Sequence, residues 1–190
     1  MTFGGRLAKN FVFILGGARS GKSRFAQSMA AKLGKKVLFV ATGEPLDEEM
    51  TLRIKEHKRI RPKNWRTLEI GIKVGQKLKV HIGDTEVVLL DCLTLLISNV
   101  FLNKVKNLEK MNFAEAEKQV MVEVEELIEC IDECKGNFIV VSNEVGLGLV
   151  SENKLGRIYR DLLGKANQLL AQHATEVYFM VSGIPVKIKG

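Results

Sequence analysis

The sequence contains few cysteines, prolines and aromatic residues, and it lacks a long apolar segment. Its 190 residues include three prolines and three cysteines, and only 6% are aromatic. The longest apolar runs, such as Phe11–Leu15 and Val87–Leu90, are far shorter than the roughly 20 residues of a membrane span. These shortages argue against a membrane span and a proline-rich linker, so we expect a single domain over residues 1–190.

The first ten residues are expected to form a loosely held leader. Two cations precede a short apolar stretch there, as they do in a secretory signal. That stretch has only five residues, however, and it runs directly into a glycine-rich segment. A leader therefore explains residues 1–10 better than a cleaved signal peptide does.

The cysteines indicate neither a disulfide framework nor a zinc site. Their number is odd, and no Cys-x-x-Cys pair occurs. Cys130 and Cys134 are four residues apart, which makes them neighbours on one face of an expected helix. Zinc would need further ligands, and none lie nearby in sequence. We therefore expect reduced thiols, with Cys92 as the third, and a cytoplasmic protein.

The chain is basic, with a net charge of +7 and a pI near 9.3. One concentration of cations consists of Lys55, Lys58, Arg59, Arg61, Lys63 and Arg66. Such a cluster attracts polyanions, either nucleic acid or the phosphates of a nucleotide. Aromatic residues do not alternate with these cations, which weakens the case for binding single-stranded nucleic acid.

Apolar segments alternate with amphipathic ones along the chain. We expect strands at 11–15, 36–41, 66–70, 87–91, 138–142 and 176–182, with a short additional strand at 186–188. We expect helices at 22–33, 47–60, 93–104, 114–134 and 152–173. Fully apolar strands separated by helices predict a mostly parallel sheet covered on both faces, in an α/β fold. Ligands bind at the carboxyl ends of such strands, here residues 16–23, 42–43, 91, 143–144 and 182–183.

The segment GGARSGKS, residues 16–23, fits the phosphate-loop pattern G-x-x-x-x-G-K-[ST]. It follows an expected strand and opens an expected helix. The alternative is a glycine-rich turn that binds no ligand, but such a turn would need neither the strand before it nor the helix after it. Backbone N–H groups of such a loop face the phosphates of a nucleoside triphosphate. The predicted binding residues are Gly16, Gly17, Ala18, Arg19, Ser20, Gly21, Lys22 and Ser23. Lys22 is expected to be exposed and to reach the phosphates, and Ser23 to place its hydroxyl on Mg²⁺.

Asp91 ends the apolar strand expected at 87–91. An acid in this position is the usual magnesium partner of a phosphate loop. The alternative is that Asp91 only caps the helix that follows. We favour a Mg²⁺ site made by Ser23 and Asp91.

His57 lies among cations, in the segment RIKEHKRIRP at residues 53–62. If the helix continues, Arg53 and Arg61 lie one turn on either side of it. A solvated basic helix with an inert histidine would explain this pattern. Alternatively, His57 is a nucleophile toward phosphorus, with Lys58 and its neighbours balancing the phosphate charge. His81, in an expected polar connection, and His173, at an expected helix end, suit an inert role better.

Several of these segments together resemble the bifunctional adenosylcobinamide kinase / adenosylcobinamide-phosphate guanylyltransferase family of cobalamin biosynthesis. They are GGARSGKSRFA (16–26), ATGEPLDEEMTLRIKEHKRIRPKNWRTLE (41–69), LLDCLTLLISN (89–99), SNEVGLGLV (142–150), LGRIYRDLLGKANQLLA (155–171) and VSGIPVKIK (181–189). The resemblance is collinear over nearly the whole chain. It implies a RecA-like P-loop fold and a small homo-oligomer, with a trimer favoured.

The resemblance also implies two reactions and their residues. A nucleoside triphosphate, ATP or GTP, phosphorylates adenosylcobinamide, and GTP then donates GMP through a guanylylated histidine, which matches His57. The residues carried over as nucleotide-binding are Ala41, Thr42, Gly43, Lys58, Arg59, Ile60, Arg61, Glu69 and Asp91. Glu144 matches the acid of N-E-V-G, where a base for the kinase step and a metal contact both fit.

Two alternatives remain open. Another P-loop small-molecule kinase would share the phosphate loop and Asp91 but would give His57 no task. A nucleotide switch or a recombinase-type ATPase on DNA would account for the pI of 9.3 and would bind DNA in a salt-sensitive way. It would have no need for the N-E-V-G segment, so we expect no nucleic-acid partner.

Overall fold

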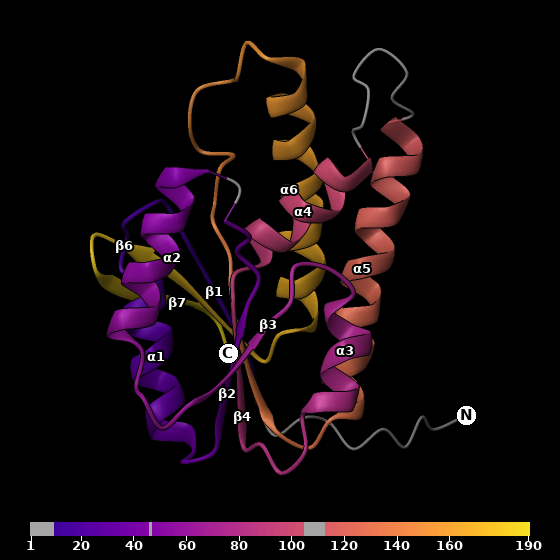
Figure 1. The fold of residues 1–190 in the computed structure, drawn as a ribbon. Helices are drawn as coiled ribbons and strands as arrows, with labels where there is room; N and C mark the ends of the chain where they lie inside the picture. The colour runs from indigo at the N-terminus through magenta and orange to yellow at the C-terminus, as the bar shows by residue number, and fades with distance from the viewer. Residues whose placement is uncertain (1–9, 46, 105–112) are drawn as a thin grey trace.

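The computed structural model describes residues 10–45, 47–104 and 113–190 and contains a seven-stranded sheet between two layers of helices (Figure 1). The strand order is β3-β2-β4-β5-β1-β6-β7. Strands β1 to β6 are parallel, and only β7 is antiparallel to its neighbour β6. The predicted three-layer α/β/α fold with a mostly parallel sheet is confirmed.

The elements follow the alternation seen in the sequence. The strands are β1 (Phe11–Gly16), β2 (Val37–Ala41), β3 (Arg66–Glu69), β4 (Val87–Asp91), β5 (Asn137–Val141), β6 (Glu176–Val181) and β7 (Ile184–Lys189). The helices are α1 (Lys22–Leu33), α2 (Glu48–Ile60), α3 (Val74–His81), α4 (Leu93–Lys104), α5 (Phe113–Glu133) and α6 (Lys154–His173). None of the helices in the described part of the chain is long and apolar enough to cross a membrane.

The two faces of the sheet bury alternate residues of the same strands. In β1, Phe11, Phe13 and Leu15 pack in the cluster that includes α3 to α6, whereas Val12 and Ile14 pack in the cluster that includes α1. Figure 1 shows α1 and α2 on one side of the sheet and α3 to α6 on the other. Because both faces are covered, β1, β4 and β5 are buried almost throughout, which explains their continuous apolar sequences.

Helix α3 was not predicted, and His81 is its last residue rather than part of a polar connection. The helix has only eight residues, and no local side chain caps its start. Instead, the buried carboxylate of Glu123 in α5 accepts hydrogen bonds from the backbone nitrogens of Lys73 and Val74, at 2.9 and 2.7 Å. Since this cap comes from 49 residues away, nothing in the local sequence revealed the helix.

The amino edge of the sheet includes Asn10. Its backbone oxygen accepts a hydrogen bond from the nitrogen of Phe138 at 2.8 Å, and its side-chain oxygen accepts one from the Thr175 hydroxyl at 2.7 Å. The predicted leader therefore does not extend to residue 10, and residues 1–9 lie outside the described part of the chain. The other predicted boundaries lie within two residues of those observed.

Candidate nucleotide-binding site

The phosphate loop connects β1 to α1 at the carboxyl edge of the sheet. Gly21 caps α1 in a left-handed conformation with φ of 94°, which favours glycine. A Cβ on Gly16 would lie only 2.7 Å from the backbone oxygen of Met180 in β6. Both fixed glycines of the pattern are therefore required by the backbone path as well as by the approach of a phosphate.

Lys22 is buried, not exposed as predicted, with 7% of its surface accessible. It is the first residue of α1, and its Nζ donates a hydrogen bond to the backbone oxygen of Gly17 at 2.6 Å. Burial lowers the pKa of its ammonium group, while Cys92 and Asp91 act in the opposite direction. The loop therefore folds around its own lysine, whose present acceptor is a neutral carbonyl.

Two other strand ends contact this loop, as predicted from the parallel sheet. The nitrogen of Glu144, after β5, donates a hydrogen bond to the oxygen of Gly16 at 3.0 Å. The nitrogen of Gly183, in the turn between β6 and β7, donates to the oxygen of Ser20 at 2.9 Å. The Glu144 side chain accepts a hydrogen bond from the nitrogen of Gly146 at 2.6 Å. The segments after β5 and β6 are thus both hydrogen-bonded to the segment after β1.

Asp91 lies beside the phosphate loop with an unused acceptor. Its Oδ2 is buried and has no hydrogen-bond partner among the described residues. Burial raises the pKa of the carboxyl group, and a hydrogen bond from Ser23 and the charges of His57, Lys22 and Arg61 partly oppose that rise. These residues therefore lie close enough to Asp91 to act on its charge, and four of the predicted site residues surround it.

The pair Ser23 and Asp91 fits a magnesium ion better than a calcium or zinc ion. The described residues contain no cluster of three or more His, Cys, Asp or Glu that could hold a metal. Mg²⁺ typically takes one or two carboxylates and fills its other positions with water and substrate phosphates. An unpaired carboxylate oxygen beside a serine hydroxyl at a phosphate loop matches that donor set.

Replacement of Asp91 by Asn should stabilise the free protein while it impairs catalysis. Because the pKa of Asp91 is raised on folding, wild-type stability falls as the pH rises from the ordinary pKa of Asp through the raised value. Asp91→Asn lacks this loss, so above that window we expect thermal unfolding at a higher temperature than in the wild type. The same variant should lose its Mg²⁺ response and turn over at least about 100-fold more slowly. Unchanged activity and metal response would leave Asp91 as a cap only.

Helix α2 carries the predicted nucleophile. The helix starts at the cap Asp47, whose Oδ1 accepts a hydrogen bond from the nitrogen of Met50 at 2.7 Å. His57 is exposed near the other end of α2, and its charge acts on Asp91. It therefore has solvent access, and it lies near enough to Asp91 for its charge to act on that carboxyl group.

Two of the neighbouring cations are paired with acids. Lys58 forms an ion pair with Glu69 of β3 at 2.5 Å, and Arg59 forms one with Glu56 at 2.8 Å. Both pairs are exposed, so each contributes little to stability. Their charges are nevertheless partly balanced, which differs from the prediction that all three cations near His57 face a phosphate.

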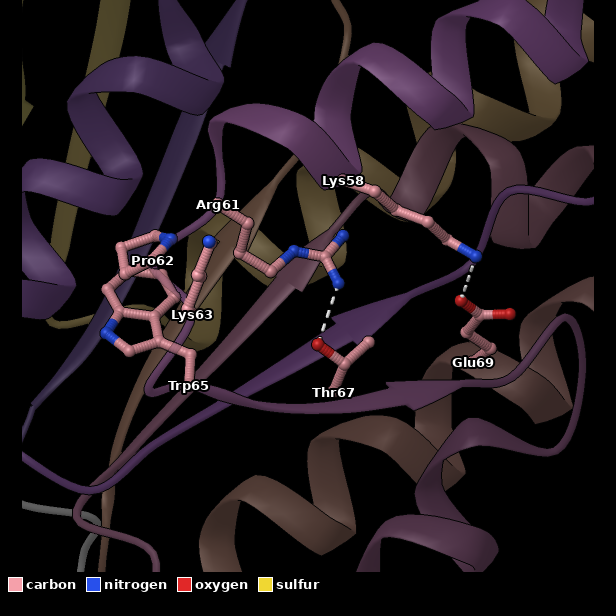
Figure 2. A pocket seen from close by; sticks show the side chains of 7 residues that line it. All are labelled: Lys58, Arg61, Pro62, Lys63, Trp65, Thr67 and Glu69. Atoms are coloured by element: carbon pink, nitrogen blue, oxygen red, sulfur yellow. Dashed lines mark hydrogen bonds and ion pairs between the residues drawn. The ribbon is translucent and has the colours of Figure 1, made fainter.

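Among Lys58, Arg59 and Arg61, Arg61 is the cation most suited to bind an anion. It follows the end of α2, which lies at Ile60 as predicted, and its backbone is extended. Its guanidinium carbon lies 3.6 Å from the centre of the Phe39 ring. Its Nη1 donates a hydrogen bond to the Thr67 hydroxyl at 2.8 Å, which Figure 2 shows as a dashed line. The buried Nε has no partner within the described residues. Burial lowers the pKa of Arg61, and the charges of Asp91 and Glu69 partly oppose this.

Arg61 and Lys58 line an open cavity of about 270 Å³ (Figure 2). The full lining is Lys58, Arg61, Pro62, Lys63, Trp65, Thr67 and Glu69. Lys58, Arg61 and Glu69 are among the residues predicted to bind nucleotide, whereas Pro62, Lys63, Trp65 and Thr67 were not predicted to do so. The one indication in the sequence was that these four residues lie in the segment R-P-x-x-W-R-T-x-E, residues 61–69, which is part of the family resemblance.

Other predicted residues lie in three places. Ala41, Thr42 and Gly43 end β2 beside β4, where the Thr42 hydroxyl donates a hydrogen bond to the oxygen of Cys92 at 2.7 Å. Ala18 and Arg19 are exposed on the phosphate loop. Ile60 is the last residue of α2, and its side chain lies outside the described part of the structure.

The cysteines and the other histidines lie away from this chemistry or are unsuited to it. Cys130 on α5 and Cys134, the residue after its end, are free, and their sulfur atoms lie 3.9 Å apart, as the spacing predicted. Burial raises the pKa of Cys92 to about 12, so its thiol is not ionised at neutral pH. His173 ends α6, as predicted, and its Nδ1 bonds to the oxygen of Leu169 at 2.9 Å.

Comparison with known proteins gives a consistent result over almost the whole chain. A family model described as "Cobinamide kinase / cobinamide phosphate guanyltransferase" matches residues 12–188. The chain is 39% identical to the bifunctional adenosylcobalamin biosynthesis protein CobU of Escherichia coli, over 94% of this chain and 99% of the relative. It is 40% identical to the corresponding protein CobP of Pseudomonas aeruginosa, over 93% and 96%.

One solved structure supports the fold alone. The protein PH0250 from Pyrococcus horikoshii OT3 aligns with a TM-score of 0.55 and 9% identity, over 97% of this chain and 88% of that one. At this identity the similarity concerns the arrangement of strands and helices and not the chemistry.

Proposed function

The chain belongs to the cobinamide kinase / cobinamide phosphate guanyltransferase family, and we propose that both reactions use one nucleotide site built around Gly16–Ser23. It is a kinase and a guanylyltransferase of cobalamin biosynthesis. The observation that carries the proposal is that the phosphate loop follows β1 and Asp91 ends β4 at the same carboxyl edge of the parallel sheet, where Asp91 keeps a buried oxygen without a partner among the described residues. We also propose a cytoplasmic location, because the three cysteines are free thiols.

In the kinase step, the aminopropanol hydroxyl of adenosylcobinamide attacks the γ-phosphorus of the triphosphate. The bond from that phosphorus to the bridging oxygen breaks, and the nucleoside diphosphate leaves. Lys22 exchanges its present bond to Gly17 for phosphate oxygens, which are stronger acceptors. We assign Glu144 to this step because it adjoins Gly16, either as the base for the hydroxyl proton or as a metal contact.

In the guanylyl transfer, a ring nitrogen of His57 attacks the α-phosphorus of GTP, and pyrophosphate leaves. The phosphate oxygen of adenosylcobinamide phosphate then attacks the same phosphorus, and the N–P bond breaks to restore the imidazole. Arg61 is suited to balance charge on the α-phosphate, since it is half-buried and no described carboxylate pairs with it.

Mg²⁺ held by Ser23 and Asp91 would neutralise charge on the phosphates when it is bound. The chain's own contribution is to keep one oxygen of Asp91 free and buried at that place. Because the charges of Lys22 and Arg61 also act on Asp91, we expect the site to favour a metal that arrives with an anionic ligand.

A direct test of the two activities is to supply purified protein with adenosylcobinamide, Mg²⁺ and GTP. Mass spectrometry should show the phosphorylated corrinoid and then its GDP derivative. If only the phosphorylated corrinoid formed, the chain would be a P-loop kinase without nucleotidyl transfer. Binding to DNA that weakened steeply with salt, without any corrinoid product, would instead favour a nucleic-acid ATPase.

We also propose a homo-oligomer, with a trimer favoured, in which the corrinoid lies in a groove shared between subunits. Two groups of apolar side chains are exposed: Leu147, Leu149 and Val150 after β5, and Ile184, Val186 and Ile188 on β7. An exposed apolar edge strand is normally covered in a stable protein. Light scattering should therefore show more than one subunit in the active enzyme, and a fully active monomer would contradict this proposal.

A further inference from the structure

Asn99 is a buried amide in a helix that is otherwise apolar on the same side. It ends the segment LLDCLTLLISN and lies in α4, with 7% of its surface exposed. Its helix neighbours Leu96, Ile97 and Val100 belong to the core. Burial of an amide in such surroundings is costly unless it forms hydrogen bonds, so its partners are informative.

The side-chain nitrogen of Asn99 donates to two backbone oxygens from different segments. One is the oxygen of Thr42, after β2, at 2.7 Å, and the other is the oxygen of Gly71, after β3, at 3.0 Å. Thr42 lies within the predicted nucleotide-binding segment 41–43, and Gly71 follows Glu69 by two residues. A single amide group therefore connects two segments that carry nucleotide-binding residues.

Thr42 extends this connection to β4. Its hydroxyl donates to the oxygen of Cys92 at 2.7 Å and accepts from the nitrogen of Cys92 at 2.9 Å. Its backbone nitrogen donates to the oxygen of Asp91 at 3.4 Å. The hydrogen bonds that start at Asn99 thus reach the residue that we assign to Mg²⁺.

We propose that Asn99 is a positioning residue for the nucleotide site. In this role Asn99 contacts no ligand itself, and its hydrogen bonds fix the spacing between the segments that carry Thr42, Glu69 and Asp91. The role rests on the proposed nucleotide site. An amide is suited to the task because one nitrogen supplies two N–H donors, which two carbonyl oxygens require. Asp at position 99 would present oxygens to both carbonyls, and Leu would keep the volume but donate nothing.

The test measures binding of N-methylanthraniloyl-GTP with Mg²⁺ and needs no corrinoid. Asn99→Leu and Asn99→Asp should bind this fluorescent probe roughly tenfold more weakly than the wild type, as other outer-shell substitutions do. The matched control is Thr175→Val, which removes hydrogen bonds to Phe11 at the opposite, amino edge of the sheet. It should lower the melting temperature but leave probe affinity unchanged.

The two measurements separate positioning from stability alone. If Asn99→Leu melted at a lower temperature, as the control does, but bound the probe like the wild type, Asn99 would be structural only and the inference wrong. If the wild type bound the probe but formed no corrinoid product, the proposed function would fail, and the comparison between the variants would still decide the role of Asn99.

Discussion

Lys22→Ala is expected to lose both the kinase and the guanylyltransferase activities, with turnover reduced roughly 100- to 1,000-fold. In the proposed function both reactions place a triphosphate on the loop at Gly16–Ser23, and Lys22 supplies the only side-chain ammonium that the loop itself contributes. Its group is already desolvated, so its attraction to phosphate is stronger than that of an exposed lysine. Steady-state assays of each reaction measure the loss.

The fold should survive this substitution, although Lys22 is buried. The hydrogen bond lost is to the oxygen of Gly17, which lies in a loop with solvent nearby. Circular dichroism should therefore match the wild type. Lys32→Ala, in the last turn of the same helix, is the control, because it also removes a lysine from α1 but should retain both activities. Full kinase turnover by Lys22→Ala would refute the assignment of the phosphate loop.

His57→Ala is expected to form no covalent adduct with GTP labelled in the α-phosphate. The kinase step should continue, because the γ-phosphoryl group passes directly between substrates and needs no nucleophilic side chain. His57 is exposed on α2, so its removal should not affect folding. Denaturing electrophoresis of the labelled protein and a separate kinase assay measure the two effects.

His81→Ala and His173→Ala are the matched controls and should label like the wild type. Both residues end helices and bond to backbone oxygens within their own helices. Wild-type labelling of His57→Ala would make α2 a solvated basic helix and would contradict the transferase proposal. Loss of labelling together with loss of kinase activity would assign His57 to nucleotide positioning instead.

The sequence predicted the parts of the fold that depend on local patterns. Strands such as β4 are apolar throughout, and the phosphate-loop spacing has few structural solutions, so their positions followed directly. Helix α3 could not be predicted, since its cap, Glu123, comes from α5. Burial of Lys22 was also missed, because it depends on how the loop folds over the side chain.

The structure brings several of the predicted site residues near one another, but the contacts of their charged groups were not evident from the sequence. The cations near His57 appeared equivalent in the sequence. In the structure, Lys58 and Arg59 pair with Glu69 and Glu56, while Arg61 packs on Phe39 and bonds to Thr67. The contacts of Lys58 and Arg61 depend on how this region packs beside the strands, so they required the three-dimensional arrangement. The pair of Arg59 and Glu56, in contrast, joins residues three apart on one helix.

The chemical stability of the GMP adduct tests the central proposal most directly. A phosphoramidate on imidazole is labile in acid, where the nitrogen is protonated and leaves, but it is durable in alkali. A phosphate ester of serine or threonine would not show this acid lability. Wild-type protein labelled from α-phosphate GTP should therefore lose its label in mild acid and keep it in base. A label that survives acid, or no label at all, would contradict guanylyl transfer through His57.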